Sequence, residues 1–202
     1  MSASLAGRRV LLSAGPPYED IDPVRFLGNR SSGRMGFALA AAAASLGAET
    51  VLVAGPVRLE TPPGVRRIDV RSAADMHEAV LSGLPADLYI GAAAVADWTP
   101  RGVASHKLKK EPGVDTFTLV LVRTADILAD VAAHPSRPRC VVGFAAETGD
   151  DADIARYARG KLERKRVDFI CANRVGVAGS GFEAEDNALR VFWNGGERRF
   201  GP

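Results

Sequence analysis

Short apolar runs alternate with helix-like segments along most of the chain, and this alternation restricts the possible folds more than any other feature. Expected strands cover residues 9–14, 49–56, 66–70, 86–98, 117–122, 139–147 and 168–173. Expected helices cover residues 35–46, 72–81, 124–133 and 152–165. The pattern predicts an α/β class, a Rossmann-like doubly wound fold with a mainly parallel sheet and helices on both faces.

Three segments add detail to this expectation. Residues 86–98 are strand-like and apolar on both faces, as in a central strand of a sheet covered by helices on both sides. Residues 187–200 alternate apolar and polar positions around Asn194-Gly195-Gly196, which predicts a C-terminal β-hairpin. Residues 99–115 are basic and interrupted by proline and glycine, so we expect a mobile loop within a single domain spanning residues 1–202.

Composition excludes several classes of protein. With 202 residues, of which 47% are hydrophobic, the chain can form a sizeable core. It lacks both the apolar run of roughly 20 residues that a membrane span needs and a secretory signal, so a cytoplasmic location is expected. Cys140 and Cys171 lie in apolar runs and are too few for a disulfide framework or a zinc site, so both are expected to be buried thiols. The three scattered histidines predict no structural metal.

The charges suggest an anionic ligand by their placement. Lys and Arg number 26 against 24 Asp and Glu, a net charge of +2 that does not indicate a nucleic-acid binder. Basic residues nevertheless gather at 106–110 and at 156–166. Most such runs are solvated surface, but two in one small domain favour a polyanion such as a nucleoside triphosphate.

The first strand and helix enclose a loop where α/β sheets commonly bind nucleotides. Neither the dinucleotide-binding glycine fingerprint nor a P-loop occurs, which argues against an NAD-dependent reductase. Instead, residues 29–36 read Asn-Arg-Ser-Ser-Gly-Arg-Met-Gly. Gly33 and Gly36 permit close backbone approach, while Ser31 and Ser32 suit either a helix cap or a ligand contact.

The longer stretch at 15–36, GPPYEDIDPVRFLGNRSSGRMG, resembles the signature of the phosphopantothenoylcysteine synthetase family. The resemblance continues in family order through AAAVADWTP at 92–100, KLKK at 107–110, GFAAETGD at 143–150, YARGKLERK at 157–165 and ANRV at 172–175. It therefore covers nearly the whole chain, and the co-occurrence of these motifs is more specific than any one of them.

The resemblance implies a two-step ligation. The carboxylate of 4'-phosphopantothenate attacks the α-phosphate of CTP to give an acyl-cytidylate and pyrophosphate, and the amine of L-cysteine then displaces CMP. The family also implies Mg²⁺ and a homodimer. An ATP-dependent form of the same ligase and a catalytically inactive nucleotide-binding module are the alternatives. The KLKK motif favours CTP, and the presence of Lys107 and Asn29 argues against an inactive module.

Three residues take catalytic or substrate-binding roles by matching family positions. Lys107 matches a loop lysine that closes over the triphosphate and stabilises the transition state. Asn29 matches an asparagine that contacts the carbonyl of the acyl-cytidylate, and otherwise would be a turn or capping residue. Arg25 matches an arginine that grips the phosphate of phosphopantothenate across a subunit boundary, and otherwise would be a surface arginine.

The remaining site residues are expected to surround the two substrates. Ala94 is assigned to phosphopantothenate. Lys161 and Lys165 lie one helical turn apart beside a buried stripe, which places them on one face for a triphosphate. A run of alanines and a phenylalanine in an apolar strand are by default packing residues. With that reservation, the nucleotide is assigned Gly15, Ser31, Gly33, Ala92, Ala93, Asp97, Lys107, Asp126, Phe144, Lys161 and Lys165.

The chain departs from the family pattern at a few points. Pro17 stands where the family more often has threonine, which puts in doubt any role for that hydroxyl, and Arg34 stands where it more often has lysine. Bacterial relatives usually carry an N-terminal flavin-dependent decarboxylase domain, whereas residues 1–8 alone precede the first expected strand. The resemblance leaves open a stand-alone synthetase or a domain separated from a larger protein.

Overall fold

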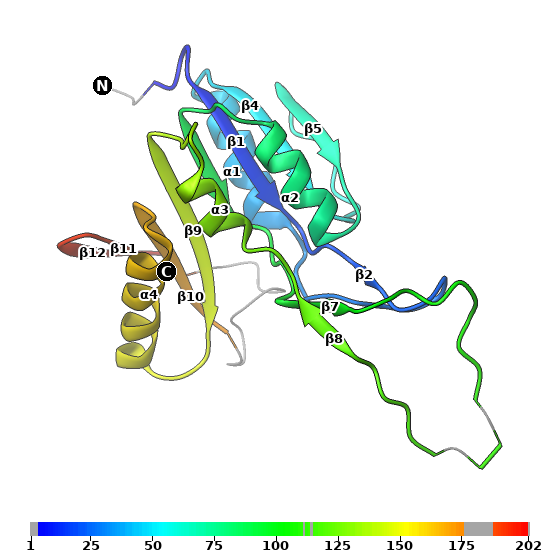
Figure 1. The fold of residues 1–202 in the computed structure, drawn as a ribbon. Coiled ribbons are helices and arrows are strands. Elements are labelled where there is room, and N and C mark those ends of the chain that lie inside the picture. The colour runs from blue at the N-terminus through cyan, green and yellow to red at the C-terminus, as the bar shows by residue number, and fades with distance from the viewer. Residues whose placement is uncertain (1–3, 111, 114, 176–187, 202) are drawn as a thin grey trace.

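The computed structural model describes residues 4–110, 112–113, 115–175 and 188–201, and these form a central sheet of eight strands in the order β12-β11-β10-β9-β6-β1-β4-β5 (Figure 1). The strands are β1 (Arg9–Ala14), β4 (Glu49–Ala54), β5 (Val65–Asp69), β6 (Leu88–Gly91), β9 (Cys140–Glu147), β10 (Phe169–Arg174), β11 (Leu189–Trp193) and β12 (Gly196–Phe200). All neighbouring pairs from β10 to β5 are parallel, whereas β10, β11 and β12 pair antiparallel. The doubly wound fold and the C-terminal hairpin are thus confirmed, and β6 takes the central place in the sheet expected of a longer strand at 86–98.

Helices cover both faces of the sheet. They are α1 (Arg34–Ser45), α2 (Ala73–Ser82), α3 (Ile127–Ala133) and α4 (Asp151–Lys165). Leu12 on β1 packs in one core cluster with Phe37 of α1, while its neighbour Leu11 packs in the other cluster with Met76 of α2 and Ile127 of α3. Because successive strand residues point to opposite faces, α1 covers one face and the other three helices cover the second.

Local sequence explains how α1 and α2 are placed. Ser72 caps α2 as predicted, through a capping box in which its hydroxyl accepts from the Asp75 N–H at 3.1 Å. Gly36 brings α1 close to the sheet, because a Cβ atom at this position would lie 2.4 Å from the Ala14 Cβ. A residue with a side chain would push α1 away from the carboxyl end of β1.

The structure corrects the expected strands at 86–98 and 117–122. β6 ends at Gly91, and β7 (Trp98–Pro100) leaves the sheet to pair antiparallel with β8 (Leu121–Arg123) in a separate two-stranded ribbon. The expectation that residues 117–122 continue the main alternation of strands and helices is therefore wrong. These residues are mostly exposed, so their apolar character does not reflect burial in the central sheet.

A second ribbon, β2 (Glu19–Asp20) and β3 (Phe26–Leu27), lies within the expected first loop. Together the two ribbons and the segment between β7 and β8 project beyond the end of the sheet (Figure 1). We call residues 18–27, 98–110 and 115–123 the arm. The large apolar side chains that the arm exposes are Val24, Phe26, Trp98, Val103, Phe117, Val120, Leu121 and Val122.

The two cysteines differ from each other. Cys171 is buried, as predicted, but Cys140 is only half-buried. Cys140 begins β9 and borders a small hollow of about 270 Å³ that Leu5 and Leu88 also line, so the prediction of a buried thiol is wrong there. Within the described part of the chain, no helix is both long and apolar enough to cross a bilayer.

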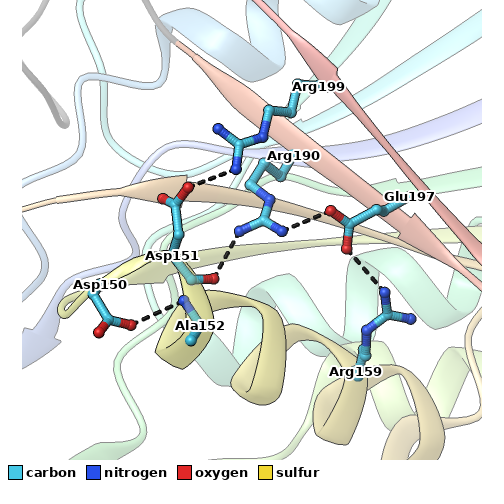
Figure 2. Close-up of polar contacts among 7 residues, drawn as sticks. All are labelled: Asp150, Asp151, Ala152, Arg159, Arg190, Glu197 and Arg199. Atoms are coloured by element: carbon cyan, nitrogen blue, oxygen red, sulfur yellow. Dashed lines mark hydrogen bonds and ion pairs between the residues drawn. The ribbon is translucent and has the colours of Figure 1, made fainter.

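The terminal hairpin holds α4 through a network of arginines and carboxylates (Figure 2). Arg190 on β11 donates to the Asp151 carbonyl at 2.7 Å and to Glu197 at 2.6 Å. Glu197 on β12 also accepts from Arg159 of α4 at 2.9 Å. Since the network grips both the first turn and the middle of α4, it fixes the rotation of the helix and hence the direction of its lysines.

Candidate functional site

A cavity of about 890 Å³ opens at the carboxyl ends of β1, β6, β9 and β10. β4 and β5 follow β1 on one side, whereas β6 lies on its other side, so the strand order reverses between β1 and β6. Open α/β sheets bind ligands in the crevice outside the carboxyl ends of the strands at such a point. The cavity therefore occupies the place where this architecture puts a ligand.

The segment after β6 forms one wall of the cavity. Its backbone continues alongside β1, with the Ala92 N–H donating to the Ser13 carbonyl at 3.0 Å and the Ala94 N–H to the Gly15 carbonyl at 3.1 Å. The Asn29 side chain donates through Nδ2 to the Ala94 carbonyl at 3.0 Å. This contact joins the loop before α1 to the three alanines, and the short methyl groups leave the backbone within reach of a ligand.

The N-terminus of α1 forms a second wall next to this segment, since a Cβ atom on Gly36 would lie 3.6 Å from the Ala92 Cβ. Its N-cap is Gly33, with φ of +77°, which has no side chain to accept from the N–H groups of the first turn. Ser31 does not cap the helix either, since its hydroxyl accepts from the Gly33 N–H at 3.3 Å. First-turn residues Arg34, Met35 and Gly36 line the cavity, so the positive end of the helix dipole borders it.

Two lysines of α4 reach the cavity, as their spacing predicts. Of the predicted stripe Ile154, Ala158 and Leu162, the first two are buried and Leu162 is half-buried. Burial lowers the pKa of the Lys161 amine, and the positive charge of neighbouring Lys165 lowers it further. Lys161 is therefore an incompletely solvated cation, and a bound anion would restore the stabilisation that water provides elsewhere.

Lys165 forms an ion pair with Asp126 at 2.9 Å. The Asp126 carboxylate is also the N-cap of α3, accepting from the Ala129 N–H at 3.1 Å. Burial raises the pKa of this carboxyl, but the hydrogen bonds from Lys165 and Ala129 outweigh it, so the net pKa lies below its usual value. Asp126 thus ties α3 to α4 at the cavity wall.

Most of the predicted site residues come together in this cavity. Those that line it are Asn29, Ser31, Gly33, Ala92, Ala93, Ala94, Asp97, Asp126, Phe144, Lys161 and Lys165. Gly15, Arg25 and Lys107 do not line it. Gly15 lies behind the wall, where a Cβ atom on Gly33 would come within 3.4 Å of its Cα.

Arg25 and Lys107 lie together on the arm. The Arg25 guanidinium forms an ion pair with Asp22 and donates to the Leu108 carbonyl at 2.8 Å. Lys107 precedes that residue and is exposed. The two predicted anion-binding residues that lie outside the cavity are thus neighbours of each other.

Sequence reasoning did not assign several cavity residues. These are Ser13, Tyr89, Trp98, Arg123, Thr124 and Asn173, among others. Ser13 lies near the end of β1 and Asn173 near the end of β10, so a search for polar residues at the carboxyl ends of predicted strands would have found both. Tyr89 is fully buried, bonds Ser13 at 3.0 Å, and has its pKa raised to about 12 by burial.

Carboxylates near the cavity are too few for a metal site built from protein ligands alone. Within the described ranges, no three His, Cys, Asp or Glu residues group closely enough to hold an ion. Asp97 and Asp126 both line the cavity. Mg²⁺ commonly binds to substrate phosphates with only one or two carboxylates, and this arrangement is compatible with such a site.

The fold and cavity define a doubly wound α/β protein with a cavity at its switch point, where this architecture binds ligands. Residues 5–201 match the family model described as DNA/pantothenate metabolism flavoprotein C-terminal domain, and the chain belongs to this family. It is 53% identical over 194 residues to the coenzyme A biosynthesis bifunctional protein CoaBC of Vibrio cholerae serotype O1, covering 96% of this chain and 48% of that protein. The CoaBC of Bacillus subtilis is 50% identical over 200 residues, covering 98% and 48%. The chain thus spans about half the length of these curated relatives.

Solved structures support the same assignment. A crystal structure of the C-terminal domain of CoaBC superimposes with a TM-score of 0.79 at 37% identity, covering 98% of this chain and 88% of that one. The DNA/pantothenate metabolism flavoprotein from Streptococcus pneumoniae superimposes with a TM-score of 0.82 at 19% identity, covering 96% and 93%. At that identity the second likeness concerns the fold alone.

Proposed function

We propose that the chain catalyses the CTP-dependent ligation of 4'-phosphopantothenate and L-cysteine, through an acyl-cytidylate, in cytoplasmic coenzyme A biosynthesis. The observation that carries the proposal is the convergence of Asn29, the α1 N-terminus and Lys161 on one cavity of about 890 Å³. That volume lies in the upper range of small-molecule sites and suits a nucleotide together with a second substrate. Membership of the family supports the choice of reaction.

The described contacts suggest how the site would perform the first step. Negative charge builds on the α-phosphate as the carboxylate attacks it, and both substrates are already anionic. The α1 N-terminus and the lysines of α4 would neutralise the phosphates from two sides. Asn29, held by the Ala94 carbonyl, would present its amide to the acyl carbonyl of the intermediate. Lys107 would be brought to the phosphates by the arm.

Mg²⁺ fits this scheme as an ion carried mainly by the nucleotide phosphates. Asp97, which lines the cavity without the N-cap role of Asp126, is the carboxylate we assign to it. When bound, the ion would withdraw charge from the phosphate oxygens. The chain's own contribution is to orient the phosphates with α1 and α4 and to keep Asp97 beside them.

The test of the proposed function is a reconstituted reaction. The purified chain is mixed with Mg²⁺, 4'-phosphopantothenate, L-cysteine and either CTP or ATP, and release of pyrophosphate and nucleoside monophosphate is followed. We expect both products with CTP. Activity with ATP alone would assign the chain to the other nucleotide class. No activity with either nucleotide, in a folded protein, would contradict the ligase proposal and favour an inactive nucleotide-binding module.

Lys161→Met should raise the KM for the nucleotide about 10- to 100-fold, because the variant loses one charge-assisted hydrogen bond to the phosphates. Methionine fills a similar volume, and removing a partly desolvated cation should not destabilise the helix. Arg164 lies on the same helix but is exposed and does not line the cavity, so Arg164→Met is the matched control. An equal rise in KM for both variants would show that the helix charge as a whole, and not Lys161, binds the nucleotide.

We also propose that the chain is a homodimer whose subunits meet through the arm. Contiguous exposed apolar surface in a protein commonly marks an interaction site, and the arm carries most of the large apolar side chains exposed on the described residues. A second copy would cover that surface and would bring Arg25 and Lys107 to a cavity they do not line in their own chain. The relatives are bifunctional proteins, so we further propose fusion to or association with a flavin-dependent decarboxylase.

Light scattering after size exclusion should give twice the chain mass for the native protein. Leu121→Lys combined with Val122→Lys should shift it to the monomer, because neighbouring strand residues point to opposite faces and one of the two must meet any interface on the ribbon. Leu46→Lys, at an exposed apolar position outside the arm, is the control and should remain dimeric. A native monomer would contradict the dimer.

A further inference from the structure

Asp22 is a fully buried carboxylate on an otherwise exposed turn. It lies between β2 and β3, and its side chain is 0% exposed while the residues that follow it, Pro23 to Phe26, are exposed. One carboxylate oxygen accepts from the Val24 and Arg25 N–H groups at 2.8 and 2.9 Å. These two contacts shape the turn and account for half of the carboxylate's bonding capacity.

The second carboxylate oxygen of Asp22 accepts a hydrogen bond from the basic loop at 106–110. It accepts from the Leu108 N–H at 3.0 Å as well as from the Arg25 guanidinium. Arg25 in turn donates to the Leu108 carbonyl at 2.8 Å. Both backbone groups of Leu108 are therefore held by the Asp22–Arg25 pair. The hydrogen bond from Arg25, followed by those from the Leu108, Val24 and Arg25 backbones, keeps the pKa of the Asp22 carboxyl far below its usual range.

Leu108 is the middle of the basic run, with Lys107 before it and Lys109 after it. A second contact, from the Ala104 N–H to the Ile21 carbonyl at 2.9 Å, ties the same loop to the same turn. The loop therefore cannot change its position relative to Arg25 without exposing a buried carboxylate or leaving it unpaired, which is costly.

Asp20, two residues earlier, makes a useful contrast. It forms an ion pair with Arg71 at 2.7 Å, and Arg71 lies between β5 and α2 on the body of the protein. Asp20 thus links β2 to the body of the protein, whereas Asp22 links the basic loop to the turn. Both aspartates pair with an arginine, but Asp20 lies in β2 with a side chain that is 31% exposed, whereas Asp22 lies in the turn and is fully buried.

We infer that Asp22 is a positioning residue that joins Arg25 and the Lys107–Lys110 run into one preassembled cationic unit, so that both act on the same bound polyanions. The inference rests on the proposed function for its catalytic consequence. The structural claim, that Asp22 holds the loop in place, rests only on the hydrogen bonds of Asp22 and Arg25 with Leu108. Asp22 pairs with Arg25, while the side chains of Lys107, Lys109 and Lys110 are exposed.

Asp22→Asn keeps the size of the side chain but loses one acceptor and the charge. We expect trypsin to cut after Lys109 and Lys110 at least about tenfold faster than in the native protein, because the opening of a loop governs its cleavage. Asp20→Asn removes the ion pair between β2 and Arg71, which does not touch the loop, and should leave the cleavage rate of the loop unchanged. Equal rates for the native protein and Asp22→Asn, or an equal increase for Asp20→Asn, would overturn the inference.

Leu108→Pro is a second variant that tests the same hydrogen bond in case Asp22→Asn fails to fold. It removes the N–H that Asp22 accepts and leaves the carboxylate in place. Trypsin does not cut the bond between Lys107 and the new proline. Cleavage after Lys109 and Lys110 can still be measured. We expect the same acceleration as in Asp22→Asn. Native cleavage rates in a folded Leu108→Pro would overturn the inference.

Steady-state kinetics tests separately whether Asp22, besides holding the loop, positions Arg25 and Lys107 for the reaction. In Asp22→Asn we expect a higher KM for 4'-phosphopantothenate together with a lower kcat, because Arg25 and Lys107 are both released, while Asp20→Asn should change neither by more than about twofold. Faster cleavage with native kinetic constants would overturn the positioning role. If the native protein has no ligase activity at all, the proposed function fails, and the cleavage rates still decide whether Asp22 fixes the loop.

Discussion

Lys107→Gln should abolish detectable formation of the acyl-cytidylate while leaving the fold intact. Glutamine is neutral and shorter in reach, so it cannot balance the charge that develops on the α-phosphate. Removing one such group commonly costs about 100- to 1000-fold in rate, or roughly 3–4 kcal/mol. Lys107 is exposed on the arm, so its replacement should change stability by no more than about 0.5 kcal/mol.

The measurement is a single turnover with 4'-phosphopantothenate and CTP in the absence of cysteine, following pyrophosphate. Omitting cysteine isolates the first step from the second. Lys110→Gln removes the same charge from the same loop and should cost far less than Lys107→Gln. Similar losses in both variants would mean that the overall charge of the loop is what counts, and substantial turnover in Lys107→Gln would remove this lysine from the mechanism.

Asn29→Asp should also lower kcat about 100- to 1000-fold. The Asn29 amide donates to the Ala94 carbonyl at 3.0 Å. A carboxylate has no hydrogen to donate there, and it would repel both that carbonyl and the anionic substrates. The local hydrogen bond is worth about 1 kcal/mol to stability, so the variant should fold, and the loss should fall on the reaction.

Trapping the acyl-cytidylate shows whether Asn29→Asp is blocked in forming this intermediate or in converting it to product. We expect little acyl-cytidylate and little final product from Asn29→Asp at saturating CTP. Asn194→Asp makes the same chemical change in the exposed turn of the terminal hairpin, outside the cavity, and should behave like the native protein. Normal turnover of Asn29→Asp would show that the assigned role of Asn29 is wrong.

Much of the fold could be predicted because the central strands are buried on both faces. Runs such as residues 9–14 and 139–147 are mostly apolar, and the structure places both in the sheet. An apolar run also led to the wrong prediction that residues 117–122 form a strand of the central sheet. A continuous apolar run looks alike whether it is covered by helices or by a partner outside the chain, and only the tertiary structure shows that these residues lie on the arm.

The site could be predicted in part for a related reason. Lys161 and Lys165 follow from helical spacing, and the turn around Gly33 follows from its composition and the family pattern. Trp98 and Arg123 could not be predicted, since they reach the cavity through the pairing of β7 with β8, which lie about twenty residues apart in the sequence. Such pairings depend on long-range contacts that local periodicity does not record.

The start of the described chain lies far from the cavity mouth, which affects how the protein can be handled. The Leu5 N–H donates to the Leu46 carbonyl at 2.8 Å, beyond the end of α1, and β1 then runs toward the cavity over six residues, roughly 20 Å. An affinity tag, a sensor surface or another domain attached ahead of Leu5 would therefore leave the cavity open to solution. Immobilisation through this end should allow ligand titration on a chip without loss of binding capacity.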